Sequence, residues 1–238
     1  MTRSALQPLV AMSRALGDPA RDYVRLGEGN TSAVRDARSF WVKASGVPLA
    51  GIGARDFVVV TQAAMQAWLD GGGPPRGGSR PPSIEALFHA VLLRLPGVRF
   101  VGHTHPTALG RLLCARNSRA LFRAPLFPDE IVYGGPAPVY VPYQDPGVPL
   151  ARAIQRGVAA HRRRYRELPR LILLENHGMI ALGATPQAVL AVTAMAVKAA
   201  EIRWGTLRAG GPRPLTPAQA RLIARRPDEQ YRRRLLSC

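Results

Sequence analysis

Short apolar runs alternate along this chain with longer helix-like segments, and glycine or proline separates most of them. Runs of a few apolar and β-branched residues between such breaks predict strands. The predicted strands are residues 39–43, 57–61, 98–102, 138–141 and 171–174, and a loop is expected at residues 27–32. The predicted helices are residues 5–16, 63–69, 83–95, 107–116, 148–166 and 185–204. This mixture of strands and helices predicts a layered α/β fold.

Three of the five histidines stand where predicted strands end: His103 and His105 after residues 98–102, and His177 after residues 171–174. Side chains two apart in an extended segment share a face, so His103 and His105 can reach one ion. Neutral imidazoles bind Zn²⁺ and related metals, and three protein ligands leave a position open for a substrate. The pattern therefore predicts a catalytic metal centre. Hydrogen-bonded core histidines are the alternative interpretation.

A carboxylate near a predicted helix start is the candidate proton carrier. Pro81 and Pro82 lead into this helix, Ser83 can cap it, and Glu85 is expected in its first turn. Negative charge is favoured there by the helix dipole. Glu85 and His89 are four residues apart and share a face. From local sequence alone, a solvated helix-start carboxylate is the more common interpretation of Glu85.

Five motifs, taken together and in order, resemble a known family. They are GNTS at residues 29–32, KASG at 43–46, PPSIE at 81–85, HTHP at 103–106 and NHGMIALG at 176–183. The chain resembles the class II aldolase/adducin family, which includes the fuculose- and rhamnulose-phosphate aldolases and the ribulose-phosphate 4-epimerase. The resemblance runs from about residue 5 to about residue 207. It implies a three-layer α/β/α fold with a mixed, mostly antiparallel central sheet, and a homotetramer with active sites at subunit interfaces.

The resemblance also implies roles for individual residues. It makes Glu85 the catalytic acid/base, and His103, His105 and His177 ligands of Zn²⁺ or another divalent metal such as Mn²⁺, Co²⁺ or Fe²⁺. The positions that match a substrate phosphate site are Asn30, Ser45, Gly46 and Ser83. The implied activity is that of an aldehyde-lyase, which cleaves or forms a C–C bond in a small sugar or sugar phosphate. Such a reaction passes through a metal-bound enediolate, and a nearby carboxylate moves the proton.

Two departures from the family pattern bear on the substrate. Ile84 replaces the second serine of the family's Pro-Ser-Ser-Glu, and Glu28 adds negative charge nearby, so a carboxylate or uncharged substrate stays open. The 4-epimerases normally carry aspartate at the position of Glu85, which favours an aldolase, or a decarboxylase of a 3-oxo sugar acid, over an epimerase. A non-catalytic adducin-like interaction module is disfavoured, since it needs neither the histidines nor Glu85. Tyr133 and Tyr231 are candidates for the family's distal tyrosine.

Charge and composition exclude further classes. Only two of the 33 lysines and arginines are lysines, Lys43 and Lys198, and neither has a partner that indicates imine chemistry. The net charge of +18 suggests nucleic acid, but no nucleic-acid-binding motif is present. A solvated basic face and a small-molecule substrate are therefore expected.

The length and the cysteine content bound the organisation. We expect a catalytic domain at residues 1–209 and a Pro/Arg-rich tail at residues 210–238, where residues 217–225 can form a short helix. No run of about eighteen apolar residues predicts a membrane span, and the first residues lack a signal-peptide core. Two cysteines give no disulfide framework and fit a reducing cytoplasm.

Overall fold

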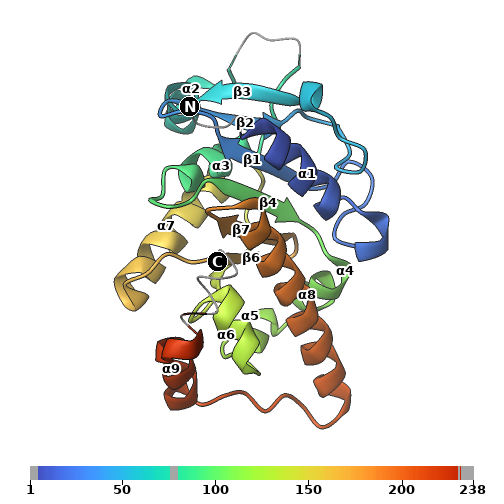
Figure 1. The fold of residues 1–238 in the computed structure, drawn as a ribbon, viewed down its shortest axis with the longest axis vertical. Coiled ribbons are helices and arrows are strands. Elements are labelled where there is room, and N and C mark those ends of the chain that lie inside the picture. Colours follow the sequence, from blue (N-terminus) through green and yellow to red (C-terminus); the bar gives the residue numbers. More distant parts are fainter. Residues whose placement is uncertain (1–4, 76–79, 230, 232–238) are drawn as a thin grey trace.

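The computed structural model describes residues 5–75, 80–229 and 231. Within them, a seven-stranded mixed sheet runs through the molecule in the order β3-β2-β1-β4-β7-β6-β5 (Figure 1). Neighbouring strands are antiparallel except for the parallel pair β5 and β6. The strands are β1 Asn30–Val34, β2 Ser39–Lys43, β3 Phe57–Thr61, β4 Phe100–Thr104, β5 Val139–Val141, β6 Leu171–Leu174 and β7 Gly178–Gly183.

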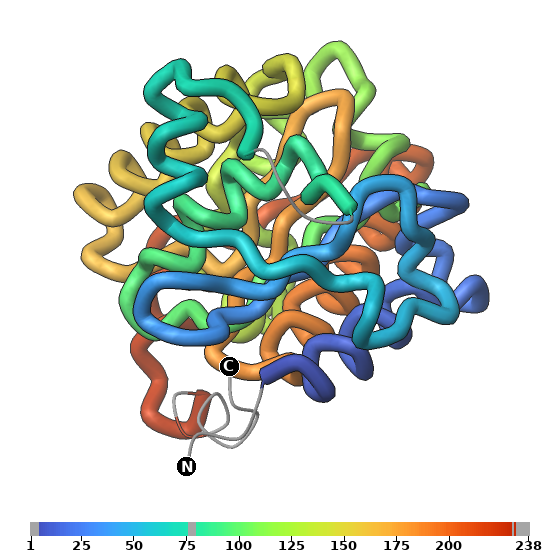
Figure 2. The backbone as a smooth tube through the Cα atoms, turned by 90° about the horizontal axis from the view of Figure 1, so that it is seen from above, coloured from blue at the N-terminus to red at the C-terminus, as the bar shows by residue number. Residues whose placement is uncertain are grey.

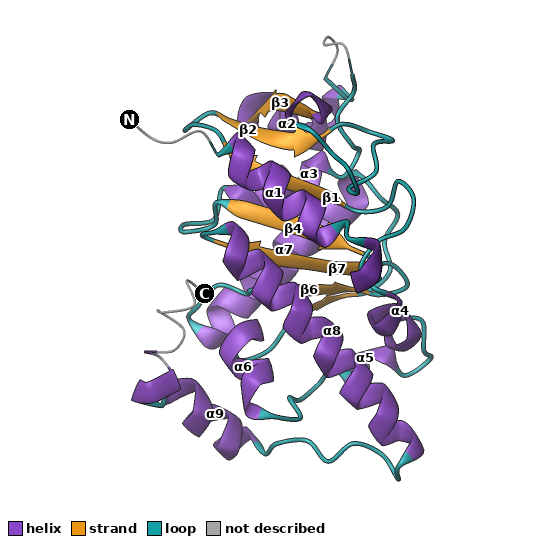
Figure 3. Cartoon of the chain, turned by 45° about the vertical axis from the view of Figure 1, so that its right-hand side comes forward, coloured by secondary structure: helices purple, strands orange, loops and turns teal. Residues whose placement is uncertain are grey.

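Helices cover both faces of this sheet (Figure 3). The α-helices are α1 Leu6–Leu16, α2 Gln62–Ala67, α3 Ala86–Leu93, α4 Thr107–Leu113, α5 Ser118–Leu121, α6 Pro128–Gly134, α7 Val148–Tyr165, α8 Pro186–Arg208 and α9 Pro217–Arg225. A π-helical turn, Trp68–Gly72, continues α2, and two 3₁₀ turns lie at Pro19–Arg21 and Ala54–Asp56.

Two apolar clusters, one on each face of the sheet, make the core. On β4, Val101 packs toward the cluster of α2, α3 and α7, whereas the adjacent Phe100 packs toward the cluster of α1, α4 and α8. On β7, Ile180 and Ala181 alternate in the same way. This alternation follows from the two-residue period of a strand. The predicted three-layer fold with a mostly antiparallel sheet is therefore confirmed.

Several predicted elements match and others need correction. The strands at residues 39–43, 57–61 and 171–174 are confirmed to the residue, and residues 217–225 are helical. The loop expected at residues 27–32 is wrong in part, because strand β1 begins at Asn30. The first three residues of β1, Asn30, Thr31 and Ser32, are polar, yet they are buried between β2 and β4. Local sequence does not reveal this burial. Strand β7 and helices α5 and α6 were also missed.

The helix expected from Ser83 begins later, at Ala86. The Ser83 hydroxyl accepts a hydrogen bond from the backbone N–H of Glu85 at 3.3 Å, but it does not cap the helix. Glu85 therefore precedes the first turn of α3, and the prediction that it lies within that turn was wrong. The turn between Pro82 and Ala86 therefore positions the Glu85 carboxylate beside the N-terminus of α3.

The C-terminal segment folds back on the rest of the chain. Helix α9 packs against α6 and lies at the periphery of the molecule, as the view from above shows (Figure 2). The Thr216 hydroxyl caps α9 by accepting from the N–H of Gln219 at 3.2 Å. Of the expected tail, residues 230 and 232–238 lie outside the described residues. No helix in the described part of the chain combines the length and apolar character of a membrane-crossing segment.

Candidate metal centre

The three predicted histidines meet at one end of the central strands. His103 lies in β4, His105 follows that strand, and His177 lies in the turn between β6 and β7. Because β4 pairs with β7 in antiparallel register, the end of one strand lies beside the start of the other. The possible ligand atoms of the three rings lie within 4.8 Å of one another. The predicted juxtaposition is therefore present, and we call these residues, with Glu85, the histidine centre.

The turn that presents His177 is tied down at several points. Asn176 adopts a left-handed conformation with φ 53°, and the N–H of His177 donates to the carbonyl of Leu174. The Glu175 carboxylate accepts from the hydroxyl of Tyr140 at 2.8 Å and from the N–H of Tyr143 at 3.0 Å. These bonds join the turn to β5 and the loop that follows it, so the position of the His177 ring is restrained by the backbone.

Glycine at position 178 makes room for the rings. A Cβ atom on Gly178 would lie 2.5 Å from the carbonyl oxygen of Thr104 and 2.8 Å from Cδ2 of His105. The first of these neighbours is backbone and cannot move aside cheaply. The close approach of β4 and β7 at this point therefore requires a residue without a side chain.

The electronic state of the rings suits a metal. Nδ1–H of His103 donates to the carbonyl of Met179 at 2.9 Å, which leaves a lone pair on Nε2. That Nε2 lies 2.8 Å from Nε2 of His105. Burial lowers the pKa of both His103 and His105 to about 3, so both rings are neutral near pH 7. Two ring nitrogens this close need a proton or a cation between them, and a donor set of three imidazoles fits a divalent metal.

Glu85 completes the histidine centre. Its Oε1 lies 3.3 Å from Nε2 of His177, and its Oε2 lies 3.4 Å from Nε2 of His103. The side chain is 12% exposed, so the carboxylate is largely removed from solvent. The interpretation of Glu85 as a solvated surface carboxylate, which local sequence favoured, is therefore wrong.

A buried hydrogen-bond chain behind Glu85 was not predicted. Nδ2–H of Asn30 donates to Oε2 of Glu85 at 2.6 Å, and Oδ1 of the same amide accepts from Nε2–H of His89. Nδ1 of His89 then accepts from the Ser32 hydroxyl at 2.6 Å. His89 is fully buried, and burial lowers its pKa to about 3, so the ring is neutral and these donor roles follow. The only signal in the sequence was the four-residue spacing of Glu85 and His89.

The other predicted substrate-binding positions lie in two segments that meet in the fold. The N–H of Ser45 donates to the carbonyl of Pro81 at 3.0 Å, and Ala44 bridges to Pro82, so the KASG and PPSIE motifs lie side by side. Gly46 has φ 75° and open space where a Cβ atom would lie, while Ser83 is half-buried. The structure thus places Ser45, Gly46 and Ser83 in one neighbourhood.

The structure also locates the residues that depart from the family pattern and the two candidate tyrosines. Ile84 is 49% exposed and lies against Gly147, in the loop before α7. The Glu28 carboxylate accepts from the N–H of Arg25. Tyr133 belongs to α6, and Tyr231, beyond α9, is 58% exposed.

Lys43 approaches the same region from β2. Its ammonium group is buried and donates to the carbonyls of Gly27 and Val47. Burial lowers the pKa of Lys43, and the negative charge of Glu85 opposes that shift. Lys43 itself belongs to KASG, so these bonds join that motif to the loop that precedes GNTS.

Known structures share this fold at low sequence identity. An L-fuculose 1-phosphate aldolase superposes with a TM-score of 0.74 and 20% identity, and the match covers 98% of each chain. YgbL from Klebsiella pneumoniae gives a TM-score of 0.69 at 23% identity, with 92% of this chain and 96% of that chain covered. L-fuculose-1-phosphate aldolase from Thermus thermophilus gives 0.63 at 23% identity, with 88% and 100% covered.

Sequence comparison adds a curated relative and a family. The uncharacterized oxidoreductase YuxG of Bacillus subtilis (strain 168) is 29% identical over an alignment of 217 residues that covers 82% of this chain. The chain spans only 29% of the length of that relative. The family described as Class II Aldolase and Adducin N-terminal domain matches residues 7–204, which include every residue of the histidine centre. On that match, this chain belongs to the class II aldolase/adducin family.

Proposed function

We propose that this protein is a divalent-metal-dependent aldolase, an aldehyde-lyase that acts on a small sugar or sugar phosphate. One observation carries the proposal: three imidazoles converge beside a largely buried carboxylate, and two of them, His177 and His103, lie 3.3 and 3.4 Å from its two oxygens. A purely structural histidine cluster has no need of an adjacent carboxylate that is itself held by a hydrogen-bond chain. Family membership supports an enzyme of the aldolase, epimerase or decarboxylase kind.

The metal would be held by His103, His105 and His177. Zn²⁺ suits three imidazoles, and Mn²⁺, Co²⁺ or Fe²⁺ are alternatives that the same donor set accepts. A bound divalent ion supplies Lewis acidity toward the carbonyl and neighbouring hydroxyl of a ketose. The protein contributes orientation, because the Met179 carbonyl holds the proton of His103 on Nδ1 and leaves Nε2 free to bind.

Glu85 is the proposed acid/base. In the condensation direction it takes a proton from the carbon next to the substrate carbonyl, and in the cleavage direction it returns that proton. Asn30 donates to Oε2 at 2.6 Å, so Oε1 is the oxygen left for proton transfer. His89 and Ser32 fix the orientation of the Asn30 amide, which would otherwise present either its oxygen or its nitrogen to the carboxylate.

We propose that Ser45, Gly46, Ser83 and Asn30 bind the anionic end of the substrate. The adjacency of the KASG and PPSIE motifs supports this assignment, as does the open space above Gly46. A phosphate is the proposed group, although Ile84 removes one hydroxyl donor. Replacing Ile84 with Ser is expected to lower KM for a phosphorylated substrate by up to about tenfold, the value of one added hydrogen bond. An unchanged KM ratio between phosphorylated and unphosphorylated substrates would argue against a phosphate site here.

The same departure favours one second candidate. An apolar residue at position 84, 49% exposed beside the predicted anion site, suits a smaller anion such as a carboxylate. Decarboxylation of a 3-oxo sugar acid uses the same carbonyl polarisation and the same proton carrier. Evolution of CO₂ from such an acid, with no exchange in the test below, would favour this candidate.

The assembly and organisation of the chain are also proposals. Family resemblance supports a homotetramer with active sites at subunit interfaces, and light scattering of the purified protein tests the tetramer. We further propose residues 1–209 as the catalytic domain and residues 210–238 as an appended tail. A cytoplasmic location stays a prediction.

The central test is proton exchange without an aldehyde partner. Purified, metal-loaded protein is incubated with dihydroxyacetone phosphate in heavy water, and the C3 proton signal is followed by NMR. Loss of the signal that stops on adding a chelator, and that is absent in Glu85→Gln, supports the proposed aldolase. If protein shown to hold its metal gives no exchange, dihydroxyacetone phosphate is not its substrate.

A further inference from the structure

A cavity of about 810 Å³ lies outside the edge strand β5, away from the histidine centre. Its walls come from β5 and the residues after it, from one side of α7, and from the segment around α5 and Phe122. Arginines line it from both sides: Arg119 and Arg123 from the α5 side, Arg156 and Arg164 from α7. We call this feature the basic cavity.

The wall of the basic cavity carries positive charge and no carboxylate among the described residues. Among the described residues, no aspartate or glutamate lines it, and none of its four arginines forms an ion pair there with a carboxylate. Guanidinium groups around one hollow repel one another, and a multiply charged anion at its centre relieves that repulsion. A basic surface that is merely solvated does not require a cavity.

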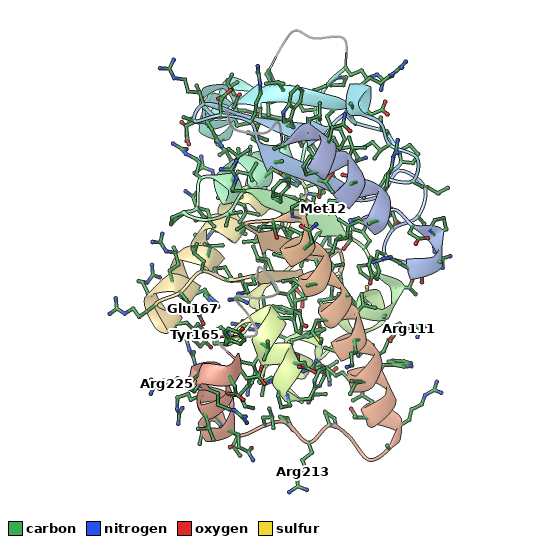
Figure 4. The ribbon with its side chains drawn as sticks, viewed as in Figure 1. Met12, Arg111, Tyr165, Glu167, Arg213 and Arg225 are labelled. Carbon is green, nitrogen blue, oxygen red and sulfur yellow. The ribbon has the colours of Figure 1, made fainter. Side chains whose placement is uncertain are left out.

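Aromatic side chains also line the basic cavity. His161 and Tyr165 lie with their ring centroids 4.7 Å apart and their planes tilted by 41°, and the Arg164 guanidinium lies 5.4 Å from the centroid of the Tyr165 ring. Figure 4 labels Tyr165 at the end of α7. His161 is only 5% exposed, and its Nε2 has no hydrogen-bond partner among the described residues. Phe122 and Tyr140 line the same cavity. Aromatic faces beside guanidinium groups suit a ligand that joins anionic groups to a ring.

We propose that the basic cavity binds a small organic anion that carries two or more negative charges on a ring-shaped body. Its volume lies within the range of small-molecule sites, so a metabolite rather than a macromolecule fits it. The shared chemistry covers polycarboxylates and phosphorylated ring compounds. This inference is independent of the proposed aldolase activity, because the basic cavity shares no lining residue with the histidine centre.

Isothermal titration of the full-length protein at about 0.15 M salt tests the proposal. One probe is benzene-1,3,5-tricarboxylate, whose diverging carboxylates chelate metals poorly, and the other is adenosine 5′-monophosphate. We expect saturable binding of one molecule per chain for at least one probe. The probe that binds more tightly identifies the anionic group as carboxylate or phosphate. Failure of both probes to saturate would overturn the proposal.

Matched double variants on α7 separate a built site from diffuse charge. Arg156→Gln/Arg164→Gln removes two lining arginines, whereas Arg162→Gln/Arg163→Gln removes the same charge from exposed positions on the same helix that do not line the cavity. We expect about tenfold or weaker affinity in the first variant and less than a twofold change in the second. Equal weakening in both would overturn the proposal.

Two further variants test where on the molecule the probe binds. Arg119→Gln/Arg123→Gln, from the opposite wall, is expected to weaken binding by a similar factor. His105→Asn in the histidine centre is expected to leave the affinity unchanged. If binding were lost in His105→Asn but retained in both cavity variants, the probe would be binding at the metal centre and the proposal would be wrong.

Discussion

The histidine centre and the basic cavity handle charge in opposite ways. In the centre, His103 and His89 are fully buried and neutral, and the polar atoms around Glu85 meet complementary partners. In the cavity, four arginines are exposed and face one another across a hollow without a carboxylate in the described residues. Burial makes a mismatched polar atom expensive, so the centre is specified atom by atom. Exposed charges are screened by solvent, so the electrostatic potential in the cavity depends on all four arginines together rather than on any single contact.

This difference predicts how each region responds to change. Substitutions at the histidine centre should act through single atoms and should resist salt, because the interactions are short and desolvated. Substitutions in the basic cavity should act through net charge and should fade as ionic strength rises. Variants in both regions therefore test this difference directly.

The strongest contrast concerns catalysis. Glu85→Gln keeps the size of the side chain and one oxygen that can accept from Asn30, but it cannot carry the proton. We expect kcat to fall by about 10²–10⁴-fold while metal content stays near that of the wild type. Steady-state kinetics and metal analysis of the same preparations check both statements.

Arg162→Gln/Arg163→Gln is the matched control for charge. Both arginines are exposed in the last turn of α7 and belong to neither site, so activity should stay within about twofold. Retention of a tenth or more of the activity by Glu85→Gln would remove this residue from the proposed acid/base role.

What the sequence could predict follows the same division. His103, His105 and His177 were recognised because their motifs are local and sit at strand ends. The hydrogen-bond partners of His89 could not be recognised from the sequence. Ser32 and Asn30 are 57 and 59 residues away from it, and only the fold brings them together. A sequence shows which residues are polar but not which are buried together.

The prediction of the strands shows a similar limit. Strands β2, β3 and β6 are apolar runs, and their bounds were predicted correctly. Strand β1 begins with three polar residues that are buried in the middle of the sheet, so its start resembled a loop. The basic cavity went unpredicted because its arginines, scattered over residues 119–164, look in the sequence like any solvated arginine.

A glycine in each region extends the comparison to packing. Gly178→Ala would place a methyl group 2.5 Å from the Thr104 carbonyl, where the backbone cannot yield. We expect a loss of about 1–3 kcal/mol in the free energy of unfolding, with reduced metal occupancy. Gly157→Ala, beside the basic cavity in α7, would meet only side-chain atoms, of which Cγ1 of Val139 is the nearest at 2.7 Å.

Helix propensity offsets the contact at position 157. Replacing glycine with alanine inside a helix gains about 0.5–1 kcal/mol, so Gly157→Ala should be near neutral. Urea unfolding of both variants in chelator compares them directly. Equal destabilisation would show that the histidine centre is no more tightly packed than the cavity wall.

The buried histidines should make the stability of the folded protein decrease at acidic pH. Burial holds the pKa of His89 at about 3 in the folded protein, against an ordinary value of 6.5 in the unfolded chain. The unfolded state therefore binds more protons below pH 6.5, and stability falls as the pH drops from 6.5 toward 3. Each such histidine contributes a slope of about 1.4 kcal/mol per pH unit in that window.

His89→Gln isolates one of these contributions. Urea unfolding of the metal-free protein between pH 7.5 and pH 5 should show a slope smaller by about one proton in the variant. The glutamine can still bond to Asn30, so the variant keeps part of the hydrogen-bond chain. An identical slope in both proteins would mean that His89 is not held neutral by burial.

The smallest effect belongs to the basic cavity. Arg156 lies in the middle of α7 and faces the other cavity arginines, so Arg156→Gln should relieve repulsion and raise stability at low salt by no more than about 0.5 kcal/mol. Arg163 lies in the last turn of the same helix, where the helix dipole favours a cation, so Arg163→Gln should not stabilise. At about 0.5 M salt the difference between the two variants should vanish, because the Debye length is then shorter than the cavity. Urea midpoints at both ionic strengths measure it, and a gain that persisted at high salt would mean that packing, rather than uncompensated charge, distinguishes the two positions.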